Sequence, residues 1–266
     1  MAISDITTKL LSPFSRASEQ ERKSFLRLST GSRINKASDD AAGLAIASSL
    51  DAIAVTSRQA ARNANDGNSI ADIAEGTLQN VANITTRQAE LASQAANGTL
   101  SDDQRAALNQ EYQALEQEKL RQIETAEFNG TKVFNTSGTT LQVGTTGGAE
   151  SQITVPSAST ASLSASQPNI LSAEAARAAL DDLQNKVGET SSLLGQIGAS
   201  VSRLEVAKKA AQDSEVESRA ASSRIRDVDV AEEVSKKVAA SILVQSGTAL
   251  QAQANLNSRT VLSLLK

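Results

Sequence analysis

The stretch RLSTGSRINKASDDAAGLAIASSL, residues 27–50, predicts a joint between two helices. An apolar helical pattern stops at Gly31, and glycine commonly follows the end of a helix. After a basic link, Ser38 predicts the N-cap of a second helix. Asp39 and Asp40 would then lie in its first turn, where the helix dipole favours negative charge. The sequence therefore predicts that a short polar link divides the chain near its start.

The amino-acid composition favours long paired helices over a thick globular core. The chain has 266 residues, of which 39% are hydrophobic but only 2% are aromatic, and it has no tryptophan. Small aliphatic side chains must do most of the packing, and they let helices approach one another closely. We therefore expect a mainly α fold: a long antiparallel helical bundle or coiled coil, with a small β-hairpin element in the middle of the chain.

The charge and hydropathy patterns argue against two classes of partner. The net charge is -4 and no basic stripe with interleaved aromatic residues is present, so nucleic acid is not an expected ligand. No apolar run approaches the roughly 18 residues that a membrane-spanning helix needs. The first residues also lack a charged segment followed by an apolar one, so we expect no standard secretory signal.

Hydrophobic periodicity divides the chain into three parts. Residues 1–128 and 172–266 carry apolar residues three and four apart, whereas residues 129–171 are rich in Thr, Ser and Gly. The predicted helices cover about 38–96, about 101–127, a long segment from about 172, and 230–266. In the middle part, apolar and polar residues alternate on both sides of a turn at Gly147-Gly148, which predicts a β-hairpin. The alternating apolar residues are Leu141 and Val143, then Ile153 and Val155.

The two ends of the chain carry similar apolar seams. The C-terminal seam is Val234, Val238, Ile242, Ala249, Ala252 and Leu256, and the more ragged N-terminal one is Ile3, Ile6, Leu10, Phe14 and Ala17. Heptad-like seams of this kind are typical of coiled coils, so we expect the two ends to form an antiparallel pair. A two-helix pair buries only one seam. We therefore expect it to be weakly ordered in a monomer and firm once neighbouring copies cover its other apolar faces.

Four segments of the sequence resemble bacterial flagellin. They are RLSTGSRINKASDDAAGLAIA, ELASQAANGTLSDDQRAALNQEYQALEQE, EFNGTKVF and SRIRDVDVAEEVSKKVAASILVQSGTALQAQANLNSRTVLSLLK, in the order that the family has them. The resemblance covers residues 25–135 and 190–266. Because residues 129–171 leave little room for extra outer domains, the chain resembles a short flagellin without the variable outer domains.

The resemblance implies a division into two regions. Residues 1–34 and 227–266 would form the inner coiled coil of a filament, and residues 35–226 a helical rod with its β element at about 129–171. The joint would connect the two, and the family places subunit contacts around it. The matching residues are Arg33, Asn35, Asp39 and Asp40. Simple helix capping is an equally good explanation of the two aspartates.

The resemblance also implies partners and a location. The chain would polymerise with itself into the flagellar filament used for motility and would meet the filament cap and junction proteins. It would be exported through the flagellar type III apparatus, without signal cleavage, to the extracellular flagellum. A dedicated secretion chaperone would bind the C-terminal apolar face, at Val238, Ile242, Ala249, Leu256 and Leu264. In some flagellins a host innate immune receptor binds a patch that corresponds here to Arg87, Leu91 and Glu111, although the same surface serves as a subunit interface.

Two features of the sequence could interrupt the predicted helices. Pro13 lies where the family has a regular helix, so we expect either a kink there or a helix that starts there. Gly188, Gly195 and Gly198 lie inside the return helix, where each glycine costs about 1 kcal/mol relative to alanine. Either tertiary packing tolerates these glycines, which we favour, or helices cross closely at them.

Three other functions compete with that of a filament subunit. An enzyme is disfavoured because the sequence has no histidine, no cysteine and no nucleotide-binding glycine motif, so we expect no catalytic residue, cofactor or metal site. A hook–filament junction protein shares the same end-to-end plan and is the main alternative. A helical-bundle adaptor unrelated to flagella is the third, and the ability to form long filaments separates it from a flagellin.

Overall fold

The computed structural model describes residues 2–164 and 169–264, with side chains from residue 12 onward except Ser258 and those beyond Thr260. Its helices are α1 Ala2–Thr30, α2 Ala41–Ala95, α3 Asp102–Thr125, α4 Thr160–Leu163, α5 Ala173–Arg226 and α6 Val230–Leu264. The predicted mainly α fold is confirmed. The chain forms two compact units, a central unit of Ile53–Val216 and a terminal unit made of everything before and after it.

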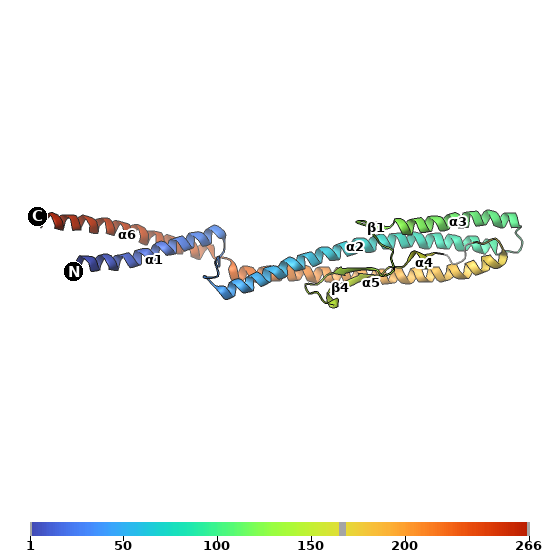
Figure 1. Ribbon diagram of the computed structural model, residues 1–266, viewed down its shortest axis with the longest axis horizontal. Coiled ribbons are helices and arrows are strands. Elements are labelled where there is room, and N and C mark those ends of the chain that lie inside the picture. The colour runs from blue at the N-terminus through green and yellow to red at the C-terminus, as the bar shows by residue number, and fades with distance from the viewer. Residues whose placement is uncertain (1, 165–168, 265–266) are drawn as a thin grey trace. The chain divides into compact units, whose positions relative to one another are not determined.

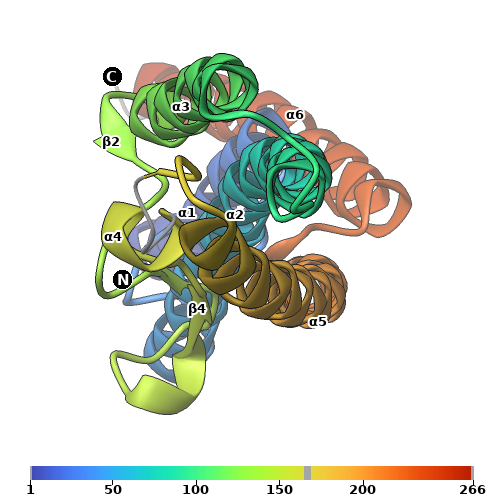
Figure 2. The same cartoon turned by 90° about the vertical axis from the view of Figure 1, so that its right-hand side faces the viewer.

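The central unit is a bundle of three long helices. Figures 1 and 2 show α2 lying between α3 and α5. Its main core combines alanines and larger aliphatic residues, including Ala64, Ala71, Leu78, Ile197 and Leu204, all with at most 3% of their surface exposed. Because alanine occupies so many buried positions on α2, its neighbours can approach closely. The sparse aromatic content is thereby compatible with a well-packed core.

Two β-hairpins complete the central unit. Strand β3 (Thr139–Gln142) pairs antiparallel with β4 (Gln152–Val155), which confirms the predicted hairpin. Its apolar side chains join the main core, and the Asn63 side chain donates a hydrogen bond to the Gln142 carbonyl at 2.8 Å. Strand β1 (Glu127–Phe128) pairs with β2 (Thr131–Lys132) through a two-residue turn in which both residues have positive φ. This second hairpin was not predicted, because its two-residue strands are too short to show an alternating pattern in the sequence.

The connection between α2 and α3 is fixed by side chains that satisfy helix ends. Ser101 and Gln104 form a reciprocal capping box at the start of α3, where a helix over about 101–127 was predicted. At the end of α2, the nearly buried Arg105 guanidinium donates to the Ala95 carbonyl at 3.1 Å and to the Asn97 carbonyl at 3.2 Å. A cation at a helix C-terminus satisfies otherwise unpaired carbonyls and complements the helix dipole.

A buried polar cluster lies between α2 and α3. The Lys119 ammonium, which has no exposed surface, contacts a Glu116 carboxylate oxygen at 2.6 Å and the Gln88 amide oxygen at 3.1 Å. The Gln88 amide nitrogen donates to the same carboxylate at 2.9 Å, and Ser164 donates to its other oxygen at 2.8 Å. Burial raises the pKa of the Glu116 carboxyl, but the hydrogen bonds from Lys119 and two neutral donors outweigh it, so the pKa lies below its ordinary value.

Pro13 in α1 and the three glycines in α5 all lie inside continuous helices. Helix α1 runs continuously from Ala2 to Thr30 through Pro13, so the expectation that a helix begins at that proline is wrong. The three glycines of α5 have no described atom within 4 Å of the position that a Cβ would occupy. Helices therefore do not cross closely there within the described chain, and the alternative of tolerated glycines is confirmed.

Replacing Gly67 by valine tests the close packing of the β3–β4 hairpin. A Cβ at this position would lie 2.5 Å from Leu141 Cδ1 and 3.1 Å from Leu204 Cδ1. Because the leucines are packed in the core, we expect the Gly67→Val variant to lose about 1–3 kcal/mol of unfolding free energy in chemical denaturation. Gly76→Val is the matched control, since nothing lies within 4 Å of the position that a Cβ would occupy there. It should unfold at the same denaturant concentration as the parent or at a slightly higher one. Equal stability of the two variants would contradict this packing.

Replacing Glu116 by glutamine tests the buried cluster. The variant leaves Lys119 buried without its carboxylate, so we expect the unfolding free energy at pH 7 to fall by about 3 kcal/mol. The pKa of Glu116 is lower in the folded chain. Its stabilising contribution is therefore complete above the unfolded pKa and is lost as the pH falls through the folded value, below the ordinary 4.5.

The unfolding free energies of the parent and the Glu116→Gln variant should therefore converge as the pH falls. Chemical denaturation of both proteins from pH 7 down to pH 2 measures the difference between them. Glu118→Gln is the control. Arg121 lowers the pKa of Glu118 to about 2, but this pair is exposed and screened by solvent, so its removal should change stability little. A constant gap between the parent and Glu116→Gln over the whole pH range would be inconsistent with a buried ion pair.

Candidate assembly interface

Two backbone connections run side by side at the joint. Gly31, with a φ of +70°, turns the chain out of α1, and Ser32 forms an antiparallel bridge with Asp227, which lies between α5 and α6. The Arg33 amide donates to the Arg226 carbonyl at 2.6 Å, and the Val228 amide donates to the Gly31 carbonyl at 3.0 Å. The link from α1 to α2 is therefore hydrogen-bonded to the link from α5 to α6.

Side chains reinforce this pairing. The Arg33 guanidinium donates to the Ile225 carbonyl at 2.8 Å at the end of α5, and the Asn35 amide donates to the Ser32 carbonyl at 2.8 Å. Ile34, between them, is 2% exposed. Arg33 and Asn35 thus hold the joint of their own chain together.

The two aspartates have separate structural roles. One Asp39 carboxylate oxygen accepts hydrogen bonds from the Asn35 amide at 3.1 Å and the Lys36 amide at 3.0 Å, and these bonds lower the pKa of Asp39. The Asp40 carboxylate accepts from the Gly43 amide at 2.8 Å, which makes Asp40 the N-cap of α2. The prediction that Ser38 caps this helix, with both aspartates in its first turn, is wrong: α2 begins at Ala41 and its first turn holds no acidic residue.

Helices α1 and α6 pair antiparallel along a polar and small-residue seam, and Figure 1 shows them side by side. The inward positions of α6 are buried or half-buried and alternate four and three apart. They are Glu233, Lys237, Ala240, Val244, Gly247, Gln251 and Ala254, with Ser241 flanking the row. Their counterparts among the described side chains of α1 are Phe14, Ala17, Glu21, Ser24, Arg27 and Leu28. This alternation is the heptad spacing of a coiled coil.

The apolar residues predicted to form the α6 seam lie on another face of the helix. Val234 is 43% exposed, Val238 is 52% exposed, and Ile242 and Leu256 are each 57% exposed. Ala249 and Ala252 are exposed as well, and the Leu264 side chain lies outside the described side chains. The prediction that these apolar residues face α1 is therefore wrong. We call Val234, Val238, Ile242, Ala249, Ala252 and Leu256 the apolar stripe of α6.

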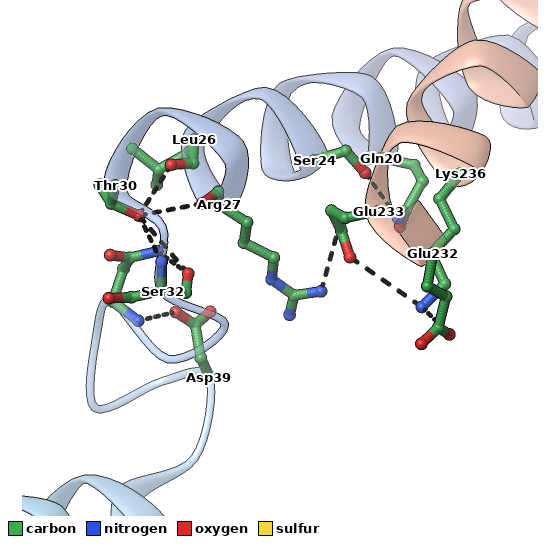
Figure 3. A network of polar contacts seen from close by, with 11 residues as sticks. Gln20, Ser24, Leu26, Arg27, Thr30, Ser32, Asp39, Glu232, Glu233 and Lys236 are labelled. Atoms are coloured by element: carbon green, nitrogen blue, oxygen red, sulfur yellow. Dashed lines mark hydrogen bonds and ion pairs between the residues drawn. The ribbon is translucent and has the colours of Figure 1, made fainter. Parts of the chain in front are cut away.

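Charged groups cross the seam close to the joint, as Figure 3 shows. Arg27 in the last turn of α1 lies 3.7 Å from a Glu233 carboxylate oxygen, and the Glu233 side chain is only 4% exposed. Lys236 lies 4.0 Å from the other Glu233 oxygen and 2.6 Å from Glu232. One helical turn further, the Lys237 ammonium sits 5.4 Å from the centre of the Phe25 ring.

The predicted receptor patch is only partly at the surface. Arg87 pairs with Glu111 at 2.8 Å and with Glu90 at 2.9 Å, and these contacts raise the pKa of the Arg87 guanidinium. Both side chains of the Arg87–Glu111 pair are about half exposed. Leu91, however, is 1% exposed and packs in a second core with Tyr112 and Leu183. Of the three residues, only Arg87 and Glu111 are available to a partner at this surface.

The described residues hold no group of side chains suited to a metal ion. The clefts described in the central unit are open grooves. One of them, about 590 Å³ in volume, is bounded by paired residues such as Arg58 with Glu215. No described helix combines the length and the apolar character needed to cross a membrane. The apolar stripe of α6 is exposed among the described side chains of the terminal unit and could bind another apolar helical surface.

Comparison with protein families identifies what the chain is similar to. Residues 6–139 match the family described as bacterial flagellin N-terminal helical region, and residues 178–265 match the bacterial flagellin C-terminal helical region. The two matches leave out only the start of the chain, its last residue and the segment that contains β4 and α4.

Individual relatives agree with these matches. A flagellin of Halalkalibacterium halodurans is 38% identical over 251 residues, which is 93% of this chain and 92% of the relative. A flagellar filament 33 kDa core protein of Treponema phagedenis is 32% identical over 263 residues, 92% of each chain. The crystal structure of Bacillus cereus flagellin has a TM-score of 0.51 at 24% identity, over 56% of this chain and 88% of that one, which supports the fold.

Hydrogen exchange of the monomer tests the contrast between the two units. The amides of α2 from Ile53 to Ala95 lie in a helix with a buried alanine face, whereas α1 and α6 share one polar seam. We expect amides of α1 and α6 to exchange at least about a hundredfold faster than those of α2 in the central unit, because few buried apolar contacts oppose their opening. Mass spectrometry of exchanged peptides measures this ratio. Similar protection in α6 and α2 would mean that the terminal pair is ordered without neighbours.

Proposed function

The chain belongs to the bacterial flagellin family, and we propose that it polymerises with itself through the apolar stripe of α6 to build the flagellar filament. It is a structural subunit of a flagellum that stands outside the cell. The stripe is the observation that carries the proposal. Four of its six residues are valine, isoleucine or leucine with 43–57% of their surface exposed, although they lie on a helix that is already paired.

Burial of the stripe supplies a driving force for assembly. Covering apolar surface stabilises a complex by roughly 25 cal/mol per Å², and a fully buried valine or leucine contributes about 1.5–3 kcal/mol. The intramolecular partner α1 cannot supply this burial, since it occupies the polar seam instead. Copies of the same chain present the same stripe at every subunit, so repeated contacts in a helical polymer cover it.

A filament subunit is favoured over the hook–filament junction protein. The relatives named as flagellin and as flagellar filament core protein align with nearly the whole chain at 38% and 32% identity. A structural role also suits the absence of histidine and cysteine from the sequence. The apolar stripe and the paired helices require neither a cofactor nor a bound metal to act.

We place the functional boundary of the chain at the joint. Residues 1–34 and 227–266 would form the inner coiled coil, and residues 35–226 the outer rod. The boundary between the two compact units lies elsewhere, after Ala52 in α2 and before Glu217 in α5. The first turns of α2 and the end of α5 therefore belong to the terminal unit. An Asp51–Arg226 ion pair at 3.1 Å connects these two segments. The joint remains the proposed boundary because all helical continuity between the two regions is interrupted there.

Further partners follow from the family. Export through the flagellar type III apparatus without signal cleavage, capture of the α6 stripe by a secretion chaperone, and contact with the cap and junction proteins are all part of the proposal. A chaperone and the filament would use the stripe at different times. The joint residues Arg33, Asn35, Asp39 and Asp40 are proposed to make contacts between copies in addition to those within the chain. Receptor recognition would rest on Arg87 and Glu111.

Deleting residues 247–266 tests the requirement for the distal part of α6. The deletion removes Gly247, against which the Phe14 ring packs, together with Ala249 and Leu256 of the stripe. We expect a chain with a folded central unit that does not elongate filament seeds, measured by circular dichroism and by electron microscopy. Filaments of normal length and stability from this variant would contradict the proposal.

A pair of matched point variants separates the stripe from the helix that carries it. Val238→Asp places a charge in the stripe, and we expect it to raise the critical concentration for seeded polymerisation at least about tenfold, since the burial of one valine is lost. Ser235→Asp places the same charge at another exposed position of α6 and should polymerise nearly like the parent. Equal critical concentrations for the two variants would exclude the stripe as the interface.

A further inference from the structure

We propose that Arg27 and Glu233, with Phe14 and Gly247, fix the register in which α1 and α6 pair. The inference rests on the proposed function only for its consequence in the filament, because the pairing itself lies within one chain. The ion pair and the ring contact are specificity-determining contacts. They select one alignment of two helices whose seam otherwise consists of small and polar residues.

The two contacts agree on one alignment. Arg27 lies opposite Glu233 near the joint, and the Phe14 ring lies opposite Gly247 about four turns away. A Cβ on residue 247 would lie 2.8 Å from Phe14 Cδ2, so the ring occupies space that only glycine leaves open. Gly247 is the single glycine of α6. Gly247 is therefore the one position along α6 where the seam has room for the Phe14 ring. When the ring lies there, Arg27 is level with Glu233 and the ion pair forms.

Other alignments separate or oppose these groups. Sliding α6 by one turn in one direction brings Lys237 level with Arg27, where two cations repel each other across the seam. Sliding it by one turn in the opposite direction brings Glu233 level with Ser24, which is fully buried and offers no positive charge. In both cases Phe14 faces a side chain larger than glycine. The native alignment is the one in which charge and shape are satisfied together.

The ion pair is suited to specificity more than to stability. Glu233 is nearly removed from solvent, yet the carboxylate oxygen nearest Arg27 has no hydrogen-bond partner among the described residues. The cost of removing a charge from water is therefore offset only in part by Arg27 at 3.7 Å. Buried polar groups at coiled-coil seams are well known to set register at the expense of stability. Here Arg27 and Glu233 would select one register for α1 and α6 but would stabilise the two helices only weakly until neighbouring copies surround them.

The surrounding charges do not replace Arg27. Lys236 belongs to the same helix as Glu233, so the contact between them is the same in every alignment of α6 with α1 and cannot favour one register. Asp39 lies close enough to Arg27 for the guanidinium to lower its pKa, but both of its backbone hydrogen bonds hold it in the joint. Arg27 is thus the cation on α1 that faces Glu233 among the described side chains.

Charge reversal and charge exchange in the full chain test the ion pair. We expect Arg27→Glu alone and Glu233→Arg alone to raise the critical concentration of seeded polymerisation at least about tenfold. The double exchange should return it to within about threefold of the parent. The recovery is incomplete because each charge then opposes the dipole of its own helix. Single variants that polymerise like the parent, or a double variant as poor as the singles, would overturn the inference.

Glu19 and Lys23 supply the matched control. They form an exposed pair on the same helix, 3.1 Å apart, with about half of each side chain exposed, and they do not face α6. The exchange Glu19→Lys with Lys23→Glu alters the same charges without touching the seam. It should polymerise within about twofold of the parent. A loss as large as that of Arg27→Glu would mean that any charge change on α1 is disruptive, and this too would overturn the inference.

Disulfide cross-linking measures register directly in the dilute monomer. The chain has no cysteine, so introduced pairs react without competition. In the native alignment Ala17 lies level with Val244. Oxidation should therefore join Ala17→Cys to Val244→Cys at least about tenfold faster than to Ala240→Cys, one turn away. Replacing the ion pair by Arg27→Met and Glu233→Leu should leave the helices paired or make them more stable, but should lower this ratio towards one.

An unchanged cross-linking ratio in the apolar double variant would overturn the role of the ion pair in register. The measurement is independent of polymerisation. If the parent chain itself failed to elongate seeds, the proposed function would fail while the cross-linking ratio still reported on register. If the parent polymerised and the ratio did not change, only the present inference would fail.

Discussion

The pairing of α1 with α6 along a seam of polar and small residues is the constraint on which the rest of the terminal unit depends. Two helices that share a single seam must place their other faces in solvent or against other molecules. Here the seam contains Glu233, Lys237 and Ser24, while valine, isoleucine and leucine line the outside of α6. This inverts the usual distribution of a coiled coil, whose apolar residues meet between its own helices. The inversion makes sense for a subunit that becomes complete only within a polymer.

The central unit follows the opposite rule. Its two cores enclose most of its large aliphatic residues, and the buried side chains of Gln88, Glu116 and Lys119 bind one another within the chain. Alanines on α2 and the absence of a side chain at Gly67 allow α5 and the β3–β4 hairpin to pack closely against that helix. The cores of the central unit are therefore covered by residues of the same chain and need no second copy to bury them.

Much of this organisation could be predicted from the sequence, and the errors have physical causes. Helical periodicity located α3, and alternation about Gly147-Gly148 located the β3–β4 hairpin, because both signals are local. The seam of α6 was misassigned because apolar residues were assumed to face the nearest helix, whereas the heptad from Glu233 to Ala254 contains mostly polar and small residues. Its regular spacing is a signal that could have found it. Leu91 was placed at a surface because the sequence alone does not distinguish the buried side of an amphipathic helix from a docking face.

The double connection at the joint has a mechanical consequence. A single peptide strand between two helices acts as a swivel, since rotation about its own axis meets little resistance. At the joint, residues 31–33 and 226–228 run next to each other and are cross-bonded by backbone hydrogen bonds. Such a double strand can bend about the line between its members, but twisting it requires those bonds to break. The joint would therefore keep the paired helices α1 and α6 from turning freely about their own axis relative to the first turns of α2 and the end of α5.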